Sequence, residues 1–169
     1  MKVLDTKKSK LQKLESEFGS NNIEYILSTS DSVQSAINES DMVIGSVYEV
    51  GKEAPKVVFK DMLKSMSPGT VMVDVSIDQG GCFETSRPTT HDNPTFVEND
   101  IVHYCVTNMP GAVPLTATQA LNKVTLKYIE DLANKGVENA LTEDEHLRNG
   151  LNIQNGEITH PAVRDALNN

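Results

Sequence analysis

Short apolar runs alternate with single amphipathic segments through the first two thirds of the chain. Runs of about four to six apolar residues suit strands buried on both faces, and single helical connections join parallel strands. The expected strands are Val3-Leu4, 23–27, 42–46, 71–75 and 101–106. This alternation therefore predicts an α/β fold with a doubly wound parallel sheet.

The helices between these strands have recognisable ends. Gly19 is placed to terminate the first helix, and Thr29 or Ser30 can cap the second. A third helix is expected around Met62–Met66, closed by Ser67-Pro68-Gly69.

The pattern changes after Pro110. One long helical segment, 116–135, and a short terminal helix, 161–167, replace the alternation. We therefore expect two parts, residues 1–111 and residues 112–169.

Composition excludes several classes of function. The net charge of −9 argues against nucleic acid as a partner, because phosphate binding needs clustered Lys and Arg. No apolar stretch approaches the roughly 20 residues that cross a bilayer, and no signal peptide opens the chain, so we expect a cytoplasmic protein with no membrane partner. Cys82 and Cys105 are expected to be reduced, buried and unreactive. No spacing of His, Cys or carboxylates suggests a metal site.

Ligands of doubly wound sheets bind at the carboxyl ends of the strands. In dinucleotide-binding folds an acid at the end of the second strand binds the adenosine ribose, about 20 residues after a glycine-rich phosphate loop. Asp5 ends the first expected strand, but the ten glycines form no G-x-G-x-x-G. If Asp5 is that acid, the first strand and the loop precede Met1. The alternative is that Asp5 is a solvated helix N-cap.

The segment after the fourth expected strand is more specific. Gly80 and Gly81 allow a sharp turn and a close approach to a flat ring. Asp78 can then orient an amine or accept its proton. Asn108, after the next strand, can offer both a donor and an acceptor to a nicotinamide edge. His103, within that strand, is expected to be a structural residue.

Three runs, 77–84, 86–90 and 108–114, closely resemble NAD-dependent alanine dehydrogenase, and the resemblance continues in register along essentially the whole chain. It implies a Rossmann-type NAD-binding domain inserted into a substrate domain. Residues 1–111 then correspond to an NAD domain that lacks its first strand and glycine-rich loop. Residues 112–169 correspond to the C-terminal helical part of the substrate domain.

The resemblance also implies roles for individual residues. Asp78 matches the catalytic aspartate, and Asp5 matches the ribose acid that favours NAD over NADP. Tyr48 is a departure, because many members carry Leu at that position. The residues implied to bind NAD are Asp5, Lys10, Ser28, Val47, Tyr48, Val75, Ser76, Ile77, Asp78, Arg87, Val106, Thr107, Asn108 and Met109.

The family oxidises L-alanine to pyruvate and ammonium, with hydride transfer to NAD, and forms hexamers. Its substrate-binding His, Lys and Arg have no counterpart here, so the isolated chain is expected to bind NAD weakly and to be inactive. Segment 116–135 is a candidate subunit interface. Two alternatives remain: the NAD-binding subunit of proton-translocating transhydrogenase, and a non-catalytic remnant that only folds and associates.

Overall fold

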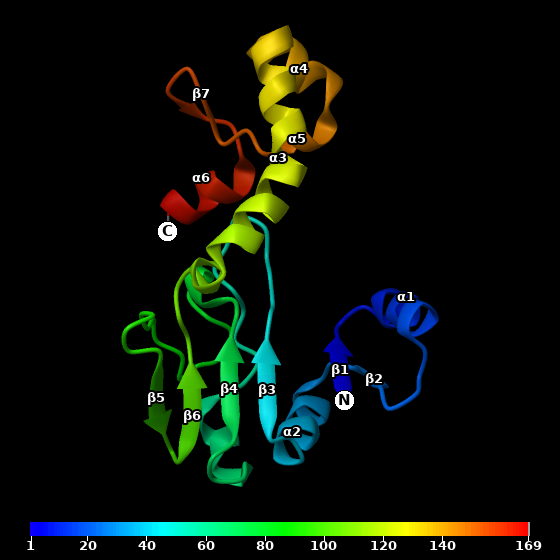
Figure 1. Cartoon of the computed structure of the whole chain (residues 1–169), viewed down its shortest axis with the longest axis vertical. Coiled ribbons are helices and arrows are strands. Elements are labelled where there is room, and N and C mark those ends of the chain that lie inside the picture. Colours follow the sequence, from blue (N-terminus) through cyan, green and yellow to red (C-terminus); the bar gives the residue numbers. More distant parts are fainter. Residues whose placement is uncertain (169) are drawn as a thin grey trace. The chain divides into compact units, whose positions relative to one another are not determined.

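The computed structural model describes residues 1–168 (Figure 1). The chain divides into two compact units. The first unit comprises Met1–Tyr48 and Ala54–Thr107, and the second comprises Glu49–Glu53 and the residues from Asn108 onward. The assignment of an NAD-binding domain and a substrate domain stays a prediction.

The strands of the first unit form two sheets. In the smaller sheet, β1 (Lys2–Asp5) pairs in parallel with β2 (Glu24–Leu27). The larger sheet has the order β3-β4-β6-β5, in which β3, β4 and β6 are parallel. Its strands are β3 (Met42–Gly45), β4 (Val71–Asp74), β5 (Thr95–Glu98) and β6 (Ile101–Tyr104). The predicted α/β fold with a mainly parallel sheet is confirmed.

One strand of the larger sheet runs against the others. β5 is antiparallel to β6, with Phe96 opposite His103. Its four residues contain two apolar side chains, Phe96 and Val97, so the sequence carries too short a pattern to predict a strand.

The helices of this unit begin and end largely where their sequences indicate. Gly19, with φ +70°, ends α1 (Lys8–Phe18). Thr29 caps α2 (Ser30–Asn38) through a capping box with Ser32, in which each side chain accepts the other residue's backbone N–H.

The third expected helix is a 3-10 helix, η1 (Lys60–Ser65). Met66, which follows it, is extended, with ψ 152°. A proline disfavours helical geometry in the residue before it, so Pro68 leaves no room for further α-helical turns.

A hydrophobic core lies on the larger sheet. Met72 of β4 and Ile101 of β6 are fully buried, together with Phe83 from the loop after β4. Gly45 makes this packing possible, because a Cβ there would overlap the Cys82 sulfur and the Phe83 ring.

The second unit is mainly helical. The predicted long helix and terminal helix are confirmed as α3 and α6. The run Glu143-Asp144-Glu145 favours a helix start, and α5 begins there, whereas α4 and the hairpin were not expected. Its elements are η3 (Met109–Ala112), α3 (Pro114–Lys135), α4 (Val137–Glu143), α5 (Glu145–Asn149), β7 (Ile153–Gln154), β8 (Glu157–Ile158) and α6 (Pro161–Leu167).

One ion pair and one buried residue hold α3 and α4 together. Lys135 of α3 contacts Glu143 of α4 at 3.0 Å, in addition to Asp131 of its own helix at 2.8 Å, and Ala140 of α4 is buried. Much of the apolar surface of α3 remains open, for example Ile129. None of the helices in residues 1–168 has the length and apolar character needed to cross a membrane.

Candidate functional site

The loop that follows β4 is organised around one buried carboxylate. Asp74, the last residue of β4, is fully buried. Its oxygens accept hydrogen bonds from the backbone N–H groups of Ser76 (3.0 Å), Cys82 (2.8 Å) and Phe83 (3.2 Å). The Ser86 hydroxyl (2.6 Å) and the Cys82 thiol (3.4 Å) also donate to it. Because five donors converge on Asp74, both ends of the loop are fixed to the sheet.

Two glycines allow the loop to close over this carboxylate. Gly80 (φ +85°) and Gly81 (φ +74°) both have the left-handed geometry that favours glycine. A Cβ on Gly81 would lie 2.8 Å from an Asp74 carboxylate oxygen and 2.9 Å from the Ser86 Cβ. The sharp turn predicted for this pair is therefore confirmed.

A lysine holds the same loop from its outer side. The Lys56 ammonium donates to the carbonyl oxygens of Gly80 and Gly81, both at 2.6 Å. Beside it, the Ala54 N–H donates to the Gln79 carbonyl at 2.8 Å. The loop backbone is thus fixed by a carboxylate on one side and an ammonium on the other.

Asp78 lies at the tip of this fixed loop. It belongs to the short 3-10 turn η2 (Ile77–Gln79), in which Ile77 is buried and anchors the turn. The Asp78 side chain is exposed, and within residues 1–168 its carboxylate has no hydrogen bond or ion pair. A carboxylate in this position can accept a proton or orient an amine that arrives from solvent.

The loop is also tied to the end of β3. The Ser76 hydroxyl donates to the Val47 carbonyl at 2.8 Å, and the Val75 N–H donates to the Gly45 carbonyl at 2.8 Å. Val75 is half-exposed, and Tyr48 is 67% exposed. The structure therefore brings Val47 together with Val75 and Ser76, among the residues implied to bind NAD.

Three other residues implied to bind NAD lie together at the ends of β1 and β2. The Asp5 carboxylate accepts the Lys7 N–H at 2.7 Å and lies 3.5 Å from the Lys10 ammonium. Ser28, after β2, donates its N–H to the Asp5 carbonyl at 3.0 Å. The N-cap of α1 is Lys7, so Asp5 is not the N-cap residue itself.

A cavity of about 350 Å³ lies beside the strand ends. Ser28 and Val47 both line it, so residues that follow β2 and β3 share one hollow. Most of its other lining residues come from β1, α2 and β3.

The residues after β6 differ in their surroundings. Val106 is fully buried, and its backbone pairs with Thr89. The Thr107 N–H donates to the Thr89 carbonyl at 3.2 Å. Asn108 has φ +55° and precedes Met109, the first residue of η3; both belong to the second unit.

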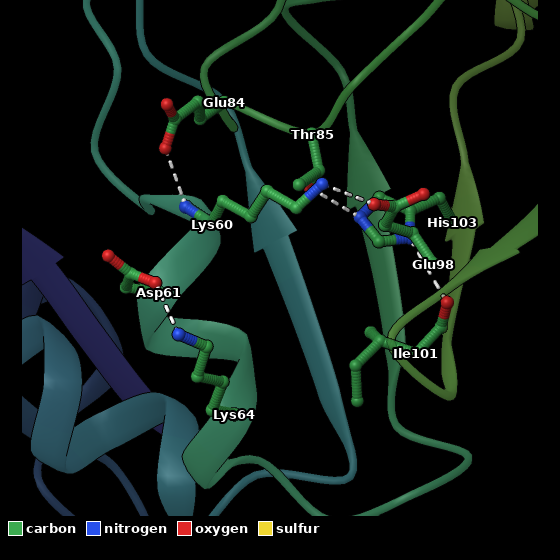
Figure 2. A network of polar contacts seen from close by, with 8 residues as sticks. All are labelled: Lys60, Asp61, Lys64, Glu84, Thr85, Glu98, Ile101 and His103. Carbon is green, nitrogen blue, oxygen red and sulfur yellow. Dashed lines mark hydrogen bonds and ion pairs between the residues drawn. The ribbon is translucent and has the colours of Figure 1, made fainter.

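An aromatic pair supports Arg87. The Arg87 guanidinium carbon lies 4.0 Å from the Phe96 ring centroid, and the His103 ring stacks on Phe96 at 4.8 Å. Figure 2 shows buried His103 between the Thr85 hydroxyl, 2.8 Å from Nε2, and the Ile101 carbonyl, 3.1 Å from Nδ1. Burial lowers the pKa of His103 below its usual range. The structural role predicted for His103 is confirmed.

Lys60 makes one ion pair and one backbone hydrogen bond on this side of the sheet (Figure 2). The Lys60 ammonium contacts Glu98 at 2.8 Å, and the Lys60 N–H donates to the Glu84 carboxylate at 2.6 Å. These contacts fix η1 to β5 and to the loop after β4.

Both cysteines are fully buried and unpaired. Burial, followed by the nearby Asp74 carboxylate, raises the pKa of the Cys82 thiol to about 12. Burial also raises the pKa of Cys105. Because the thiolate is the reactive form, the predicted lack of reactivity agrees with these surroundings. Residues 1–168 contain no cluster of three His, Cys, Asp or Glu that could hold a metal ion.

Comparison with known proteins gives the family. The family model for the alanine dehydrogenase/PNT C-terminal domain matches residues 1–161. The chain belongs to this family. The alanine dehydrogenase of Halomonas elongata is 49% identical over 164 residues, which cover 97% of this chain and 44% of the relative. A solved structure of L-alanine dehydrogenase has a TM-score of 0.84 and 45% identity, covering 99% of this chain and 46% of that chain.

A transhydrogenase from Sinorhizobium meliloti has the same fold. Its TM-score is 0.69 at 21% identity, and the match covers 95% of this chain and 42% of that chain. The resemblance to alanine dehydrogenase is confirmed, and the similarity to the dehydrogenases is the greater of the two. The chain spans less than half the length of these proteins.

Asp74 and Lys56 organise the site, and sequence reasoning missed both roles. Asp74 directly follows the apolar run 71–73, so a buried acid at a strand end was the available signal. Lys56 carried no comparable signal, because its partners are backbone carbonyls that only the folded loop brings together.

Proposed function

We propose that the chain is the C-terminal portion of an NAD-dependent alanine dehydrogenase. The reaction is the oxidation of L-alanine to pyruvate and ammonium, with transfer of a hydride to NAD. The observation that carries this proposal is the 49% identity over 97% of the chain to the Halomonas elongata alanine dehydrogenase. The exposed Asp78 carboxylate at the tip of a rigid loop supports it.

The strand ends suit the adenosine half of NAD. The Asp5 side chain is 27% exposed and keeps acceptor capacity beyond its contacts with Lys7 and Lys10. Ribose hydroxyls can donate to it, whereas a 2′-phosphate about 4 Å away would be repelled by roughly 4 kcal/mol per unit charge at an effective dielectric of 20. We therefore propose that Asp5 selects NAD over NADP, with Lys10, Ser28, Val47 and Tyr48 nearby.

The nicotinamide half is assigned to the loop after β4 and to the residues after β6. NAD supplies the hydride acceptor when it is bound. We propose that Val75 to Asp78, Arg87 and Val106 to Met109 hold that end. Because the Val106 side chain is fully buried, its contact would be made by the backbone.

Asp78 is the proposed catalytic residue. Oxidation of an amine to an imine releases a proton from nitrogen, and a carboxylate at hydrogen-bond distance can accept it or orient the lone pair. The contacts of Asp74 and Lys56 would keep this carboxylate in place during the reaction.

We further propose a cytoplasmic homo-oligomer, a hexamer as in the family. Five apolar side chains of α3 are more than half exposed, which favours a helix that packs against another subunit. They are Leu115, Leu121, Val124, Leu126 and Ile129.

A chimera tests the function. The matching C-terminal region of the Halomonas elongata enzyme is replaced by this chain, and L-alanine-dependent NADH formation is measured. We expect turnover, and we expect Asp78→Ala to lower kcat by about 10²–10⁴-fold while the Kd for NAD changes far less. The matched control is Asp31→Ala, an exposed acid in the first turn of α2.

Three outcomes count against the proposal. A folded chimera without activity supports a non-catalytic remnant. Hydride transfer between NADH and an NADP analogue, without a need for alanine, supports the transhydrogenase alternative. Equal losses of kcat and NAD affinity in Asp78→Ala would make Asp78 a structural ligand only.

A further inference from the structure

The Arg87 side chain is exposed but held against an aromatic ring. Its guanidinium carbon lies 4.0 Å from the Phe96 ring centroid. Within residues 1–168 the guanidinium makes no hydrogen bond or ion pair, so the ring covers one of its faces while its N–H groups stay available to a ligand. A guanidinium with a fixed plane and available donors suits an anionic oxygen or another strong acceptor.

Strand β5 sets the position of the ring. β5 pairs with β6 in antiparallel register, with Phe96 opposite His103. Phe96 is half-buried, whereas its neighbour Val97 is 64% exposed, because successive side chains of a strand point to opposite faces. The ion pair of Glu98 with Lys60, at 2.8 Å, holds the end of the strand. The sheet therefore fixes the ring independently of the guanidinium.

A buried histidine supports the ring from behind. The His103 ring is fully buried and lies 4.8 Å from the Phe96 ring, with 17° between their planes. Its Nδ1 lies 3.1 Å from the Ile101 carbonyl, and its Nε2 lies 2.8 Å from the Thr85 hydroxyl (Figure 2). Because both ring nitrogens are used, His103 cannot rotate without losing a hydrogen bond. Burial lowers its pKa, so the ring is neutral at neutral pH and does not repel the guanidinium.

The backbone on which Arg87 sits is fixed as well. Thr85, which contacts His103, lies in the same segment as Arg87. Between them, the Ser86 hydroxyl donates to the buried Asp74 carboxylate at 2.6 Å. An exposed arginine normally loses rotamer freedom when it binds a ligand, and that loss weakens binding. Here much of that freedom is removed before a ligand arrives.

We propose that Phe96 is a positioning residue for the cofactor: supported by His103, its ring holds the Arg87 guanidinium in the orientation that binds the nicotinamide half of NAD. The inference rests on the proposed function, which assigns Arg87 to that half of the cofactor. It adds a residue outside the set that the resemblance implies to bind NAD. Phe96 acts through Arg87 and makes no contact with the cofactor itself.

A double-mutant cycle in the chimera of the proposed function tests this role. Phe96→Leu removes the ring, Arg87→Met removes the charge, and a third variant carries both changes. Isothermal titration gives the Kd for NAD of the three variants and of the parent chimera. We expect Phe96→Leu to raise the Kd about two- to fivefold, as the loss of an exposed cation–π contact would. In the Arg87→Met background the same change should have no further effect.

Two further variants of β5 are the matched controls. Phe96→Tyr keeps an aromatic ring at this position and should bind NAD as the parent chimera does. Val97→Ala changes the next residue of the strand, which points to the opposite face, and should also leave the Kd unchanged.

A measurement without cofactor tests the contact itself in the full chain. A proton held over the face of an aromatic ring resonates upfield, so we expect an upfield shift of the Arg87 Nε–H proton. The shift should vanish in Phe96→Leu and persist in Phe96→Tyr. Nitrogen–proton correlation NMR gives the shift, and the resonance that disappears in Arg87→Met identifies the proton.

Each other outcome overturns the inference. An equal loss of NAD affinity from Phe96→Leu with and without Arg87 means that Phe96 supports only the fold. Unchanged binding in Phe96→Leu, or weak binding in Phe96→Tyr, means that the ring does not position the guanidinium. Unchanged binding in Arg87→Met removes Arg87 from the cofactor site, and an unshifted Nε–H proton excludes the contact.

The results separate this inference from the proposed function. A chimera that oxidises L-alanine but shows no coupling between Phe96 and Arg87 overturns the inference alone. A chimera that shows the coupling but does not oxidise L-alanine overturns the proposed function alone. A chimera that binds no NAD overturns both.

Discussion

The loop after β4 and the cavity beside β1 and β3 lie in the same unit but are completed in different ways. In the loop, buried Asp74 accepts five hydrogen bonds and Lys56 binds two carbonyls, so the chain itself satisfies the local backbone. At the cavity, β1 and β3 each have one edge without a partner strand within the described residues. The proposed nicotinamide side is thus complete by local contacts, whereas the sheet beside the adenosine side is not.

Removal of Asp74 should have the largest effect of the changes considered. Asp74→Ala leaves three buried N–H groups and the Ser86 hydroxyl without their acceptor, so we expect a loss of about 3–5 kcal/mol in the free energy of unfolding. Urea unfolding measures this loss. Asp78→Ala, four residues away and exposed, should change stability by less than about 0.5 kcal/mol. Similar losses in both variants would mean that exposed Asp78 contributes as much to the free energy of unfolding as buried Asp74 does.

A methyl group on Gly81 should have the next largest effect. In Gly81→Ala the new Cβ would lie 2.8 Å from the Asp74 carboxylate on a residue with a positive φ. We therefore expect a loss of about 3 kcal/mol in the free energy of unfolding. Gly69→Ala is the matched control, because Gly69 also has a positive φ, +86°, but has open space around its Cβ. We expect about 1 kcal/mol there from backbone strain alone. Equal losses, measured by thermal unfolding, would mean that the loop has room to relax.

The pH dependence of stability tests the burial of His103 in β6. Burial lowers the pKa of His103 in the folded protein, so the unfolded chain binds a proton at higher pH than the folded chain does. The free energy of unfolding should therefore fall as pH drops below about 6.5, at a slope of at most about 1.4 kcal/mol per pH unit from this group. His103→Gln should flatten that dependence. Urea unfolding between about pH 7.5 and 5.5 makes the measurement.

The open β3 rim of the cavity should tolerate change best. Ile44 is 63% exposed, so Ile44→Lys should change the free energy of unfolding by less than about 0.5 kcal/mol. Met72→Ala, in the neighbouring strand and fully buried, should lose about 2–5 kcal/mol. A large loss in Ile44→Lys, seen by urea unfolding, would show that the cavity is already filled in the folded protein.

The sequence predicted the main strands and helices of this fold better than its shorter elements. Apolar runs and the end signals at Gly19 and Thr29 gave strands and helices that the structure confirms. β5 was missed because Thr95–Glu98 is too short for a clear pattern, and it gains its place from pairing with β6. η1 was expected as an ordinary helix closed by Ser67-Pro68-Gly69, whereas the structure forms a 3-10 helix over Lys60–Ser65.

The candidate site was accessible from sequence only in part. The strand ends pointed to Asp5, Ser28 and Asp78, because parallel strands place their carboxyl ends together. The roles of Asp74 and Lys56 depend on which backbone groups the loop turns toward them, and no local pattern encodes that. The roles of the residues implied to bind NAD stay predictions.

One strand serves both regions compared above. β3 forms one rim of the cavity, while the carbonyls of Gly45 and Val47 at its end hold Val75 and Ser76. These two hydrogen bonds connect the position of β3 to the loop that carries Asp78.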